Sequence, residues 1–357
     1  MKVSILGSGL TSLALAKSLV NQGIKVDIFS DSKIKKNSNI QTIGISKSNT
    51  DFFNKNILDI RKFLWNINKI EIFSENFNNK KILDFENEDK TLFSIIKKKE
   101  IYDYLLLELK KNKLVNFKKK ITYNNLIKNE YKLIFNCDYN HSISKKFFYK
   151  TIDKNYNSFA HISILKHKRL SNNHSASQIF TKKGPLAFLP ISETETSVVY
   201  SIGEKKNIDL EKLIKKYNTK YKIIRLHKFI NFELKSSNLR NYYYKNIIAF
   251  GDILHRLHPL AGQGFNMTIR DIKKINELIK FKKKHGLDLD SSICLEFEKN
   301  SKDKNYLFSN GIDFIHEFFN LEKELSTNNL SKVIKFFGNS KSVKNFFTKF
   351  ADGGIIT

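Results

Sequence analysis

The chain has 357 residues, enough for one large domain or two smaller ones. Its formal net charge is +28, and nearly all of that charge comes from lysines spread along the whole chain. No apolar run reaches the roughly 18–20 residues that cross a bilayer. The two cysteines, Cys137 and Cys294, have neither a metal-binding nor a CxxC spacing, which excludes a disulfide-rich scaffold and predicts free thiols in a reducing compartment.

The positive charge has more than one interpretation. Lysine, asparagine, isoleucine and phenylalanine are all abundant, a set that tracks AT-rich codons, so genome composition accounts for much of the charge. The functional interpretations are an anionic membrane surface or a nucleic acid. The lysines are not gathered in one arm and no nucleic-acid fold motif is present, so we expect no nucleic-acid partner.

The first thirty residues predict a β-α-β unit. Residues 2–6 and a stretch through Val26, Ile28 and Phe29 have the apolar pattern of buried strands, and an apolar helix lies between them. The loop before this helix has the GxGxxS spacing, which lets a pyrophosphate approach the backbone at a helix N-terminus. The candidate ligand contacts in this unit are Gly7, Gly9, Leu10, Thr11 and Ser12.

The middle of the chain alternates between helical and strand patterns. We predict helices over residues 52–65, 99–110 and 208–218. We predict strands over residues 70–73, 82–85, 131–138, 159–165, 176–180, 184–190, 197–201 and 227–234. The strand at 131–138 ends in a carboxylate, Asp138.

The stretch from Gly251 to Asp271 carries the strongest local signal. A short buried strand at 247–250 precedes it, and a helix with isoleucines on one face follows it to about residue 284. Pro259 stiffens the approach to this helix, and a glycine on each side of Gln263 lets the backbone come close to a ligand. Such a loop presents free N–H groups to an anion or an electron-rich ring edge.

The last segments read as helical. Residues 294–319 have a helical pattern, and phenylalanines interleaved with lysines over residues 333–350 fit amphipathic helices. These helices either dock on the protein's own surface or contact a membrane, where phenylalanines enter the interface and lysines meet anionic lipid.

Residues 251–271 resemble the second FAD motif of the flavin aromatic hydroxylases, in the ubiquinone-biosynthesis (UbiH-like) branch. The first glycine loop resembles the dinucleotide motif of the same family, and residues 137–145 resemble its third motif. Residues 184–190 resemble part of its substrate-domain sheet and favour the ubiquinone branch. The matching positions in the second motif are Gly251, Asp252, His255, His258, Pro259, Ala261, Gly262, Gln263, Gly264, Asn266 and Asp271.

The resemblance implies the p-hydroxybenzoate hydroxylase fold. This is an α/β fold with a Rossmann-like FAD-binding domain of the GR2 type, an inserted, mainly β substrate domain and a helical C-terminal tail. The expected FAD-binding domain comprises residues 1–70, 95–155 and 240–290. Residues 71–94 and 156–239 would form the substrate domain, and residues 291–357 the C-terminal helices.

The resemblance also implies a function. The chain would be an FAD-dependent monooxygenase that uses NAD(P)H and O₂, through a flavin hydroperoxide, to hydroxylate the aromatic ring of a polyprenyl-phenol intermediate in ubiquinone biosynthesis. Two alternatives remain open: a flavin reductase or dehydrogenase on the same fold, and a non-catalytic flavoprotein of a quinone-synthesis complex. We expect a cytoplasmic protein in peripheral contact with the inner face of a membrane, with a quinone-synthesis complex as a candidate partner.

Site residues carry over from the matching motifs. His258, Pro259, Gly262, Gln263 and Gly264 would position the flavin ring. The expected FAD contacts are Gly7, Gly9, Leu10, Thr11, Ser12, Asp31, Gln41, Asp138, Gly251, Asp252, Pro259, Gly262, Gln263, Gly264, Phe265 and Asn266. His255 and His258 stand three residues apart, but no third ligand is near them, so we expect no metal.

Several positions depart from the family pattern. Ser30 stands where an acidic residue normally binds the ribose, and Asp31 follows one place later. Gln41 replaces an arginine that lies near the flavin, and Tyr139 replaces a glycine. Lys145 replaces the arginine of the third motif, Thr268 replaces a glycine, and Lys97, Lys98 and Lys99 are the basic candidates where an arginine often opens a helix.

Overall fold

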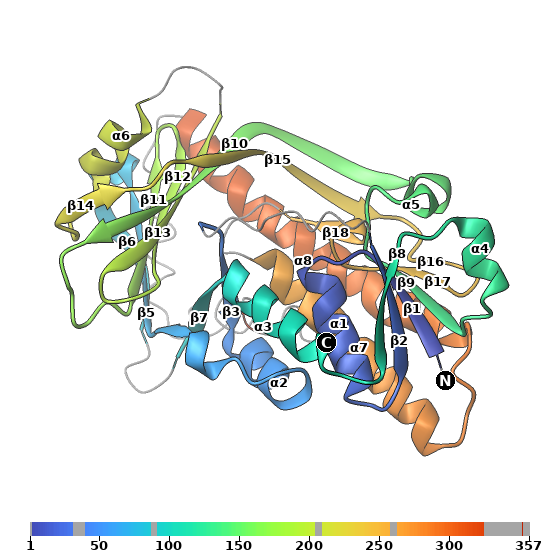
Figure 1. The fold of residues 1–357 in the computed structure, drawn as a ribbon. Helices are drawn as coiled ribbons and strands as arrows, with labels where there is room; N and C mark the ends of the chain where they lie inside the picture. The colour runs from blue at the N-terminus through green and yellow to red at the C-terminus, as the bar shows by residue number, and fades with distance from the viewer. Residues whose placement is uncertain are drawn as a thin grey trace.

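The structure is a computed structural model that describes residues 2–30, 40–86, 91–203, 209–257, 263–324 and 352. These residues form three sheets, of six, nine and three strands, with helices packed between and against them (Figure 1). The alternation of strands and helices gives the mixed α/β class that the sequence predicts. Within the described residues, no helix is long and apolar enough to cross a membrane.

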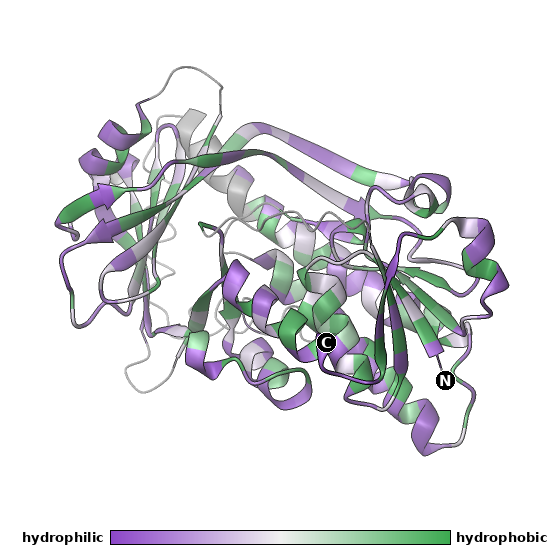
Figure 2. Ribbon diagram, in the orientation of Figure 1, coloured by the Kyte–Doolittle hydropathy of each residue, from purple (hydrophilic) through white to green (hydrophobic). Residues whose placement is uncertain are grey.

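The six-stranded sheet has the order β16-β17-β9-β1-β2-β8. Its neighbouring strands are parallel except for the hairpin of β16 and β17. The strands are β1 (Lys2–Leu6), β2 (Lys25–Ser30), β8 (Val115–Lys119), β9 (Leu133–Asn136), β16 (Tyr243–Tyr244) and β17 (Ile247–Ala249). Figure 2 shows β1, β9 and β17 as mainly hydrophobic, as expected for parallel strands covered on both faces.

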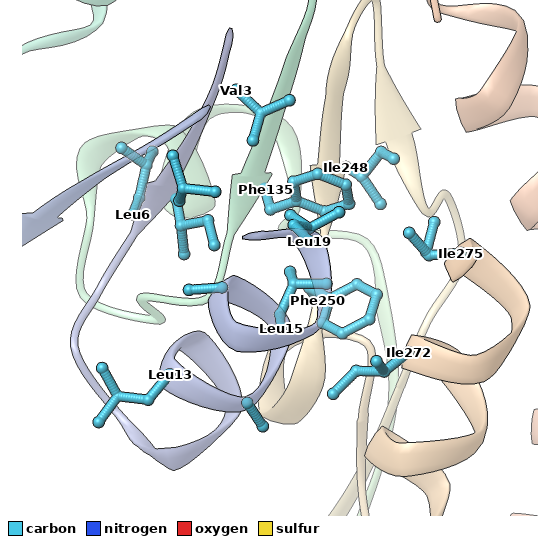
Figure 3. Close-up of a cluster of buried hydrophobic side chains, with 14 of the residues drawn as sticks. Val3, Leu6, Leu13, Leu15, Leu19, Phe135, Ile248, Phe250, Ile272 and Ile275 are labelled. Carbon is cyan, nitrogen blue, oxygen red and sulfur yellow. The ribbon is translucent and has the colours of Figure 1, made fainter. Parts of the chain in front are cut away.

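Helix α1 (Leu10–Val20) lies between this sheet and α7 (Gln263–Lys284), and also contacts α3 (Lys98–Lys110). Figure 3 shows the resulting core, in which Leu15 and Leu19 of α1 lie among Phe135, Phe250 and Ile272. Because α1 is covered on several sides, nine of its eleven residues are buried. A helix that is apolar nearly all round is the form that this central position requires.

The nine-stranded sheet forms the other half of the molecule, at the left of Figure 1. Its order is β18-β15-β10-β13-β12-β11-β5-β6, and β14 pairs with β10. Helix α6 (Leu210–Tyr217) packs on one face of this sheet. The strands are β5 (Lys69–Ser74), β6 (Lys80–Glu86), β10 (Thr151–His167), β11 (Ser175–Thr181), β12 (Gly184–Pro190), β13 (Glu195–Ile202), β14 (Ile223–Leu226), β15 (Ile230–Leu239) and β18 (His255–Arg256).

The three-stranded sheet joins the two halves. Its strands are β3 (Thr42–Ser46), β7 (Phe93–Lys97) and β4 (Trp65–Ile67), with β7 in the centre. Helix α2 (Lys47–Asn56) follows β3 directly and contacts α7. The remaining helices are the short α4 (Tyr123–Lys128) and α5 (Ser142–Phe147), and the long α8 (Ser292–Glu324).

Helix α8 packs a polar stripe against the long β10–β15 arm. Ser301, Asn305, Ser309 and Asp313 recur every four residues and are all buried. Asn238 of β15 donates to Ser309 Oγ at 2.9 Å, and Tyr156 of β10 donates to the Asp313 carboxylate. These contacts hold the arm between the two halves of the molecule against the C-terminal helix.

Most predicted elements are present, with one clear error. The helix predicted over residues 52–65 is wrong, because α2 spans Lys47–Asn56 and β4 begins at Trp65. Between them, Asn54 Oδ1 accepts a hydrogen bond from the Ile60 backbone N–H at 2.9 Å, which turns the chain. Residues 333–350, with their predicted amphipathic helices, lie outside the described residues, and the proposed division into domains stays a prediction.

Candidate functional site

Three of the predicted site segments meet at one edge of the six-stranded sheet. Gly7 follows β1, Asp138 follows β9 and Gly251 follows β17, and these three strands are parallel neighbours. Because parallel strands end at the same edge, their carboxyl ends form the crevice where α/β sheets bind ligands. A Cβ added to Gly7 would lie 3.3 Å from Asp138 Cβ, and one added to Gly251 would lie 2.7 Å from Thr11 Cγ2.

The two glycines of the first loop have different roles. Gly7 has φ +103°, a conformation that L side chains rarely adopt, and its N–H donates to the Phe29 carbonyl at 2.7 Å. Gly9 is the N-cap of α1 at φ −72°, and a Cβ there would meet nothing within 4 Å. No side chain caps this helix, so its first backbone amides, at its positive end, have no side-chain acceptor at the N-cap.

Asp138 is held by its own loop. Its backbone N–H donates to Asn136 Oδ1 at 3.2 Å, and its carboxylate accepts from the Asn140 N–H at 2.9 Å. Its carbonyl accepts from Ser144 Oγ at 2.7 Å, which ties the loop to α5. These bonds fix a carboxylate oxygen next to Gly7, where a ligand hydroxyl or amide could meet it.

Tyr139, which replaces the family glycine, does not fill the crevice. Its side chain is 60% exposed, and the Arg256 guanidinium lies 5.5 Å from its ring centroid. The Tyr139 side chain is therefore directed largely to solvent. Burial raises the pKa of the neighbouring Cys137 thiol to about 12, which disfavours its thiolate form.

The beginning of α7 supplies the fourth segment. Gln263 is its first residue; the side chain is buried and its Oε1 has no hydrogen-bond partner within the described chain. Thr268, at another family glycine position, is buried and its Oγ1 donates to the Gly264 carbonyl at 3.4 Å. The expected flavin-ring residues His258, Pro259 and Gly262 lie outside the described residues.

Asn266 connects α7 to the three-stranded sheet. Its Oδ1 accepts from the Ser46 N–H at 2.9 Å and from Asn49 Nδ2 at 3.1 Å, and its Nδ2 donates to the Gly44 carbonyl at 3.0 Å. The side chain thus fixes the position of the helix that opens at Gln263. Phe265 packs near Phe53 of α2, with ring centroids 6.3 Å apart. Direct cofactor contacts by Asn266 and Phe265 stay predictions.

A buried network supports the same loop from behind. His255 Nε2 hydrogen-bonds to Asp271 Oδ2 at 2.5 Å, and Asn305 of α8 donates to Asp271 Oδ1 at 3.0 Å. These three side chains are buried, so His255 and Asp271 connect the two ends of the motif to each other and to α8. Sequence reasoning recognised His255 and Asp271 as motif positions but missed Asn305, which no local pattern marks. Among the described residues, no three His, Cys, Asp or Glu side chains are grouped to hold a metal ion.

Some of the residues predicted to contact the ribose and the flavin edge lie within the described part of the chain. Ser30 closes β2 half-buried, and Asp31 lies outside the described residues. The Gln41 carbonyl accepts from the Lys98 N–H at 2.9 Å, which places Gln41 beside the start of α3. Of the basic candidates there, Lys97 pairs with Glu195 of β13 at 2.8 Å, and Lys99 pairs with Asp103.

The face of the nine-stranded sheet away from α6 lies toward this crevice. Thr42 of β3 donates to Ser197 of β13 at 2.8 Å, so this face is directed to the strand that leads to Ser46 and Asn266. Side chains alternate between faces along a strand, so the cross-strand pairs next to Ser197 show what it presents. One row across the sheet consists of Ile162, Val199, Ala187, Gln178 and Ile72.

That row is apolar apart from one amide, and four of its five side chains are only half-buried. On the opposite face, the buried side chains of Leu165, Tyr200 and Phe188 pack against α6. The sheet therefore offers an incompletely covered apolar surface to the crevice. Such a surface can hold a greasy ligand, with a few polar groups to orient it.

The described residues satisfy the requirements of a dinucleotide that ends in an aromatic ring. The uncapped α1 amides and the open space at Gly9 suit a pyrophosphate. The carboxylates of Asp138 and the exposed Asp252 suit hydroxyl donors. The unpaired, buried Gln263 Oε1 would be satisfied by an N–H donor, and leaving it unpaired costs stability. The residues present therefore fit FAD.

Comparison with known proteins agrees with the motifs. No family model matches the chain. Over 125 residues it is 30% identical to the mitochondrial ubiquinone biosynthesis monooxygenase COQ6 of Schizosaccharomyces pombe, a match covering 35% of this chain and 26% of that protein. The human COQ6 match is 26% identical over 204 residues (45% of this chain, 44% of that protein). The 3-demethoxyubiquinol 3-hydroxylase of Escherichia coli is 25% identical over 152 residues (40% and 39%).

Solved structures show the same fold. A p-nitrophenol 4-monooxygenase of Pseudomonas putida matches with a TM-score of 0.78 and 12% identity, over 99% of this chain and 98% of that one. HpxO of Klebsiella pneumoniae, solved with FAD and uric acid, matches with a TM-score of 0.75 and 11% identity, over 98% and 96%. The sequence matches span less than half the length of each of the three curated relatives named above. In sequence the chain is thus similar to monooxygenases of ubiquinone biosynthesis, and it shares its fold with these two solved structures.

Proposed function

We propose that this chain binds FAD at the carboxyl ends of β1, β9 and β17 and hydroxylates the aromatic ring of a polyprenyl-phenol intermediate of ubiquinone biosynthesis. The observation that carries the proposal is the meeting of Gly7, Asp138, Gly251 and the start of α7 at one sheet edge. NAD(P)H and O₂ are the proposed co-substrates. When bound, the flavin supplies the electron transfer and the oxygen activation.

The protein's own groups would bind and orient the ligands. The α1 amides beside Gly9 would hold the pyrophosphate, and Asp138 and Asp252 would accept hydrogen bonds from hydroxyls between the two ring systems. Gln263 and Gly264, with the motif residues His258, Pro259 and Gly262, would position the flavin ring. The positive end of α7 would stabilise negative charge on that ring. Asn266 and the His255–Asp271 pair would hold this helix in place.

The half-buried apolar row is the proposed contact for the substrate. Ile162, Val199 and Ala187 offer hydrophobic surface, and Gln178 offers the polar group in that row. An apolar wall suits a prenylated phenol and excludes water from the ring. The relatives named for ubiquinone synthesis motivate the choice of substrate class.

We also propose a cytoplasmic protein that contacts the inner face of a membrane and works with a quinone-synthesis complex. A prenylated substrate resides in the bilayer, so an enzyme that acts on it must meet it at the membrane surface. The net charge of +28 favours an anionic leaflet.

The test starts from purified protein with FAD. A flavin absorbance band, retained on gel filtration, is expected; its absence even after addition of FAD would refute the proposal. Turnover under ¹⁸O₂ with a short-chain prenyl-phenol should place one ¹⁸O atom in the product. FAD binding with rapid substrate-dependent NAD(P)H oxidation but no ¹⁸O in the product would favour the reductase alternative. FAD binding without any turnover would favour the non-catalytic one.

A matched pair of variants tests the substrate face. Val199→Asp places a charge in the half-buried apolar row and should raise the KM for the prenyl-phenol at least tenfold, with FAD binding unchanged. Ile224→Asp places the same charge at a 67% exposed position on β14 and should behave like the parent. Equal KM values for the two variants would remove this row from the substrate site.

A further inference from the structure

An exposed surface of aromatic rings and lysines lies at the end of the molecule farthest from α6. It is formed by α4, α5, the residues after α5 and the β16–β17 turn, which gather at the right of Figure 1. We call it the basic–aromatic surface. It consists of Tyr123, Ile127, Phe147, Tyr149 and Tyr244, with Lys128, Lys145, Lys146, Lys150 and Lys245.

Ring contacts make this surface continuous. Phe147 and Tyr244 stack with centroids 4.0 Å apart and planes 11° apart, and Tyr123 lies 5.2 Å from Phe147. Two further apolar side chains project beside them: Tyr149 is 62% exposed and Ile127 is 50% exposed. Ile127 is four residues after Tyr123, on the same side of α4. Segments from three parts of the chain thus build one apolar patch.

Two lysines of this surface, Lys146 and Lys245, lie over its aromatic rings. Lys146 Nζ lies 5.2 Å from the Tyr123 ring centroid and 5.3 Å from that of Phe147, and Lys245 Nζ lies 5.7 Å from that of Tyr244. Residues 123–128, 142–150 and 243–246 contain no Asp or Glu. Within the described chain no carboxylate oxygen lies within 4.0 Å of Lys146, Lys150 or Lys245, whereas lysines elsewhere, such as Lys97 and Lys118, are paired. These three lysines therefore form no ion pair within the described chain.

We propose that the basic–aromatic surface docks the protein on an anionic lipid bilayer. Lysine ammonium groups meet the lipid phosphates, and tyrosines sit at headgroup level, where an apolar ring with a polar tip is favoured. Ile127 and the edges of the stacked rings enter the boundary with the acyl chains. The proposal deepens the membrane contact of the proposed function by naming a face for it, and vesicle binding requires neither flavin nor turnover.

The ring geometry favours a bilayer over a nucleic acid. Single-stranded nucleic acids bind by stacking bases on free aromatic faces. Here Phe147 and Tyr244 cover each other, and Lys146 lies over the Phe147 ring. An exposed isoleucine side chain finds no apolar group to contact on a phosphate backbone, whereas burial of its apolar surface in lipid is favourable. A protein partner fits less well, because lysine is depleted from protein–protein interfaces.

The experiment is co-sedimentation of the full chain with vesicles. Neutral phosphatidylcholine vesicles are compared with vesicles that also contain phosphatidylglycerol. The parent should bind the anionic vesicles and not the neutral ones. Each lysine at an anionic leaflet contributes roughly fivefold in affinity, so the triple variant Lys146→Gln, Lys150→Gln, Lys245→Gln should lose on the order of 100-fold. Tyr149→Ser should lose several-fold, most clearly in high salt, where the lysine contribution is screened.

The control variant removes the same number of charges elsewhere. Lys55→Gln, Lys110→Gln, Lys182→Gln has the same net charge, and its lysines are exposed on other faces. It should bind anionic vesicles within threefold or so of the parent, a loss set only by long-range charge. Equal losses in the two triple variants would overturn the proposal, as would equal binding of the parent to neutral vesicles. If the parent binds a DNA duplex more tightly than it binds anionic vesicles, and the triple variant at Lys146, Lys150 and Lys245 loses that binding, the surface would be reassigned to nucleic acid. Circular dichroism confirms that each variant is folded.

Discussion

Alanine at position 7 should destabilise the fold, whereas alanine at position 9 should leave the fold intact and weaken FAD binding. At Gly7, the backbone φ of +103° is unfavourable for any L side chain, and a methyl group would lie 3.3 Å from three atoms of neighbouring segments. Left-handed conformations cost L residues roughly 1–2 kcal/mol, and the crowding adds to that. We expect Gly7→Ala to lower the free energy of unfolding of the apoprotein by about 2 kcal/mol.

At Gly9 the same methyl group causes no strain. The backbone, at φ −72° and ψ 175°, is allowed for alanine, and nothing lies within 4 Å of the added Cβ. Alanine makes the unfolded chain less flexible than glycine does, so Gly9→Ala should leave the free energy of unfolding of the apoprotein unchanged or raise it slightly. The open space is where the pyrophosphate would approach, so the methyl group should weaken FAD binding at least tenfold, which is about 1.4 kcal/mol.

Two measurements separate these effects. Urea unfolding of the apoprotein gives the stability change, and titration of FAD followed by flavin fluorescence gives the dissociation constant. Gly23→Ala is the control for a left-handed glycine away from the site, with φ +75° and no atom within 4 Å of the added Cβ. It should cost about 1 kcal/mol of stability and leave FAD affinity unchanged. FAD binding by Gly9→Ala equal to that of the parent would refute the placement of the pyrophosphate, and an unperturbed Gly7→Ala would refute the strain argument.

Three further substitutions test the packing that supports the site. Asp27 is fully buried, and although burial acts to raise its pKa, hydrogen bonds from Lys118 and Lys2 hold the pKa well below its usual range. The ionised carboxylate therefore stabilises the fold above the unfolded-state pKa, and this contribution is lost as the pH falls. In urea unfolding at neutral pH, Asp27→Asn should cost about 1–3 kcal/mol, less than the loss of a fully buried pair, because both lysines remain exposed. An equal cost in strong acid would contradict this. For Asp313 the pH dependence of stability has the opposite sign, because burial raises the pKa of its carboxyl. Its stabilising contribution is lost as the pH rises through the folded-state pKa. Asp313→Asn should therefore be more stable than the parent in neutral buffer but not in acid. Asn266→Ala removes three hydrogen bonds between α7 and β3–α2, so it should lower the melting temperature and the FAD content of purified protein; a variant with full FAD content would show that this anchor is dispensable.

The sequence alone was sufficient for the elements whose signal is local. The β-α-β unit at residues 2–30 was predictable because strand, glycine loop and apolar helix each have their own short pattern. The helix predicted from about residue 265 to 284 is present as Gln263–Lys284, and its isoleucines at helical spacing were again a local signal. The glycine at position 7 was predictable as a turn residue, and its φ of +103° shows why no other residue fits there.

Where local signals conflict, sequence reasoning failed. Phe52 to Trp65 contains apolar residues at helical spacing, yet the chain leaves the helix at Asn56 and begins β4 at Trp65. The choice is made by distant partners: Trp65 pairs with Ile95 of β7, and its indole N–H donates to the Asn173 carbonyl at 2.7 Å. A pattern read within one segment has no access to such contacts.

Tertiary structure alone decided how the site is supported and what it faces. That Asp138 lies against Gly7 follows from β9 pairing with β1 across more than a hundred residues of sequence. The same is true of Asn305 bonding Asp271, and of the row through Ile162 and Val199. The residue types and spacings of the chain determined which loops can approach a dinucleotide, because glycine conformation and helix ends are local properties. Which side chains surround those loops depends on the pairing of strands and the packing of helices, and these are set by burial of the whole core rather than by any one segment.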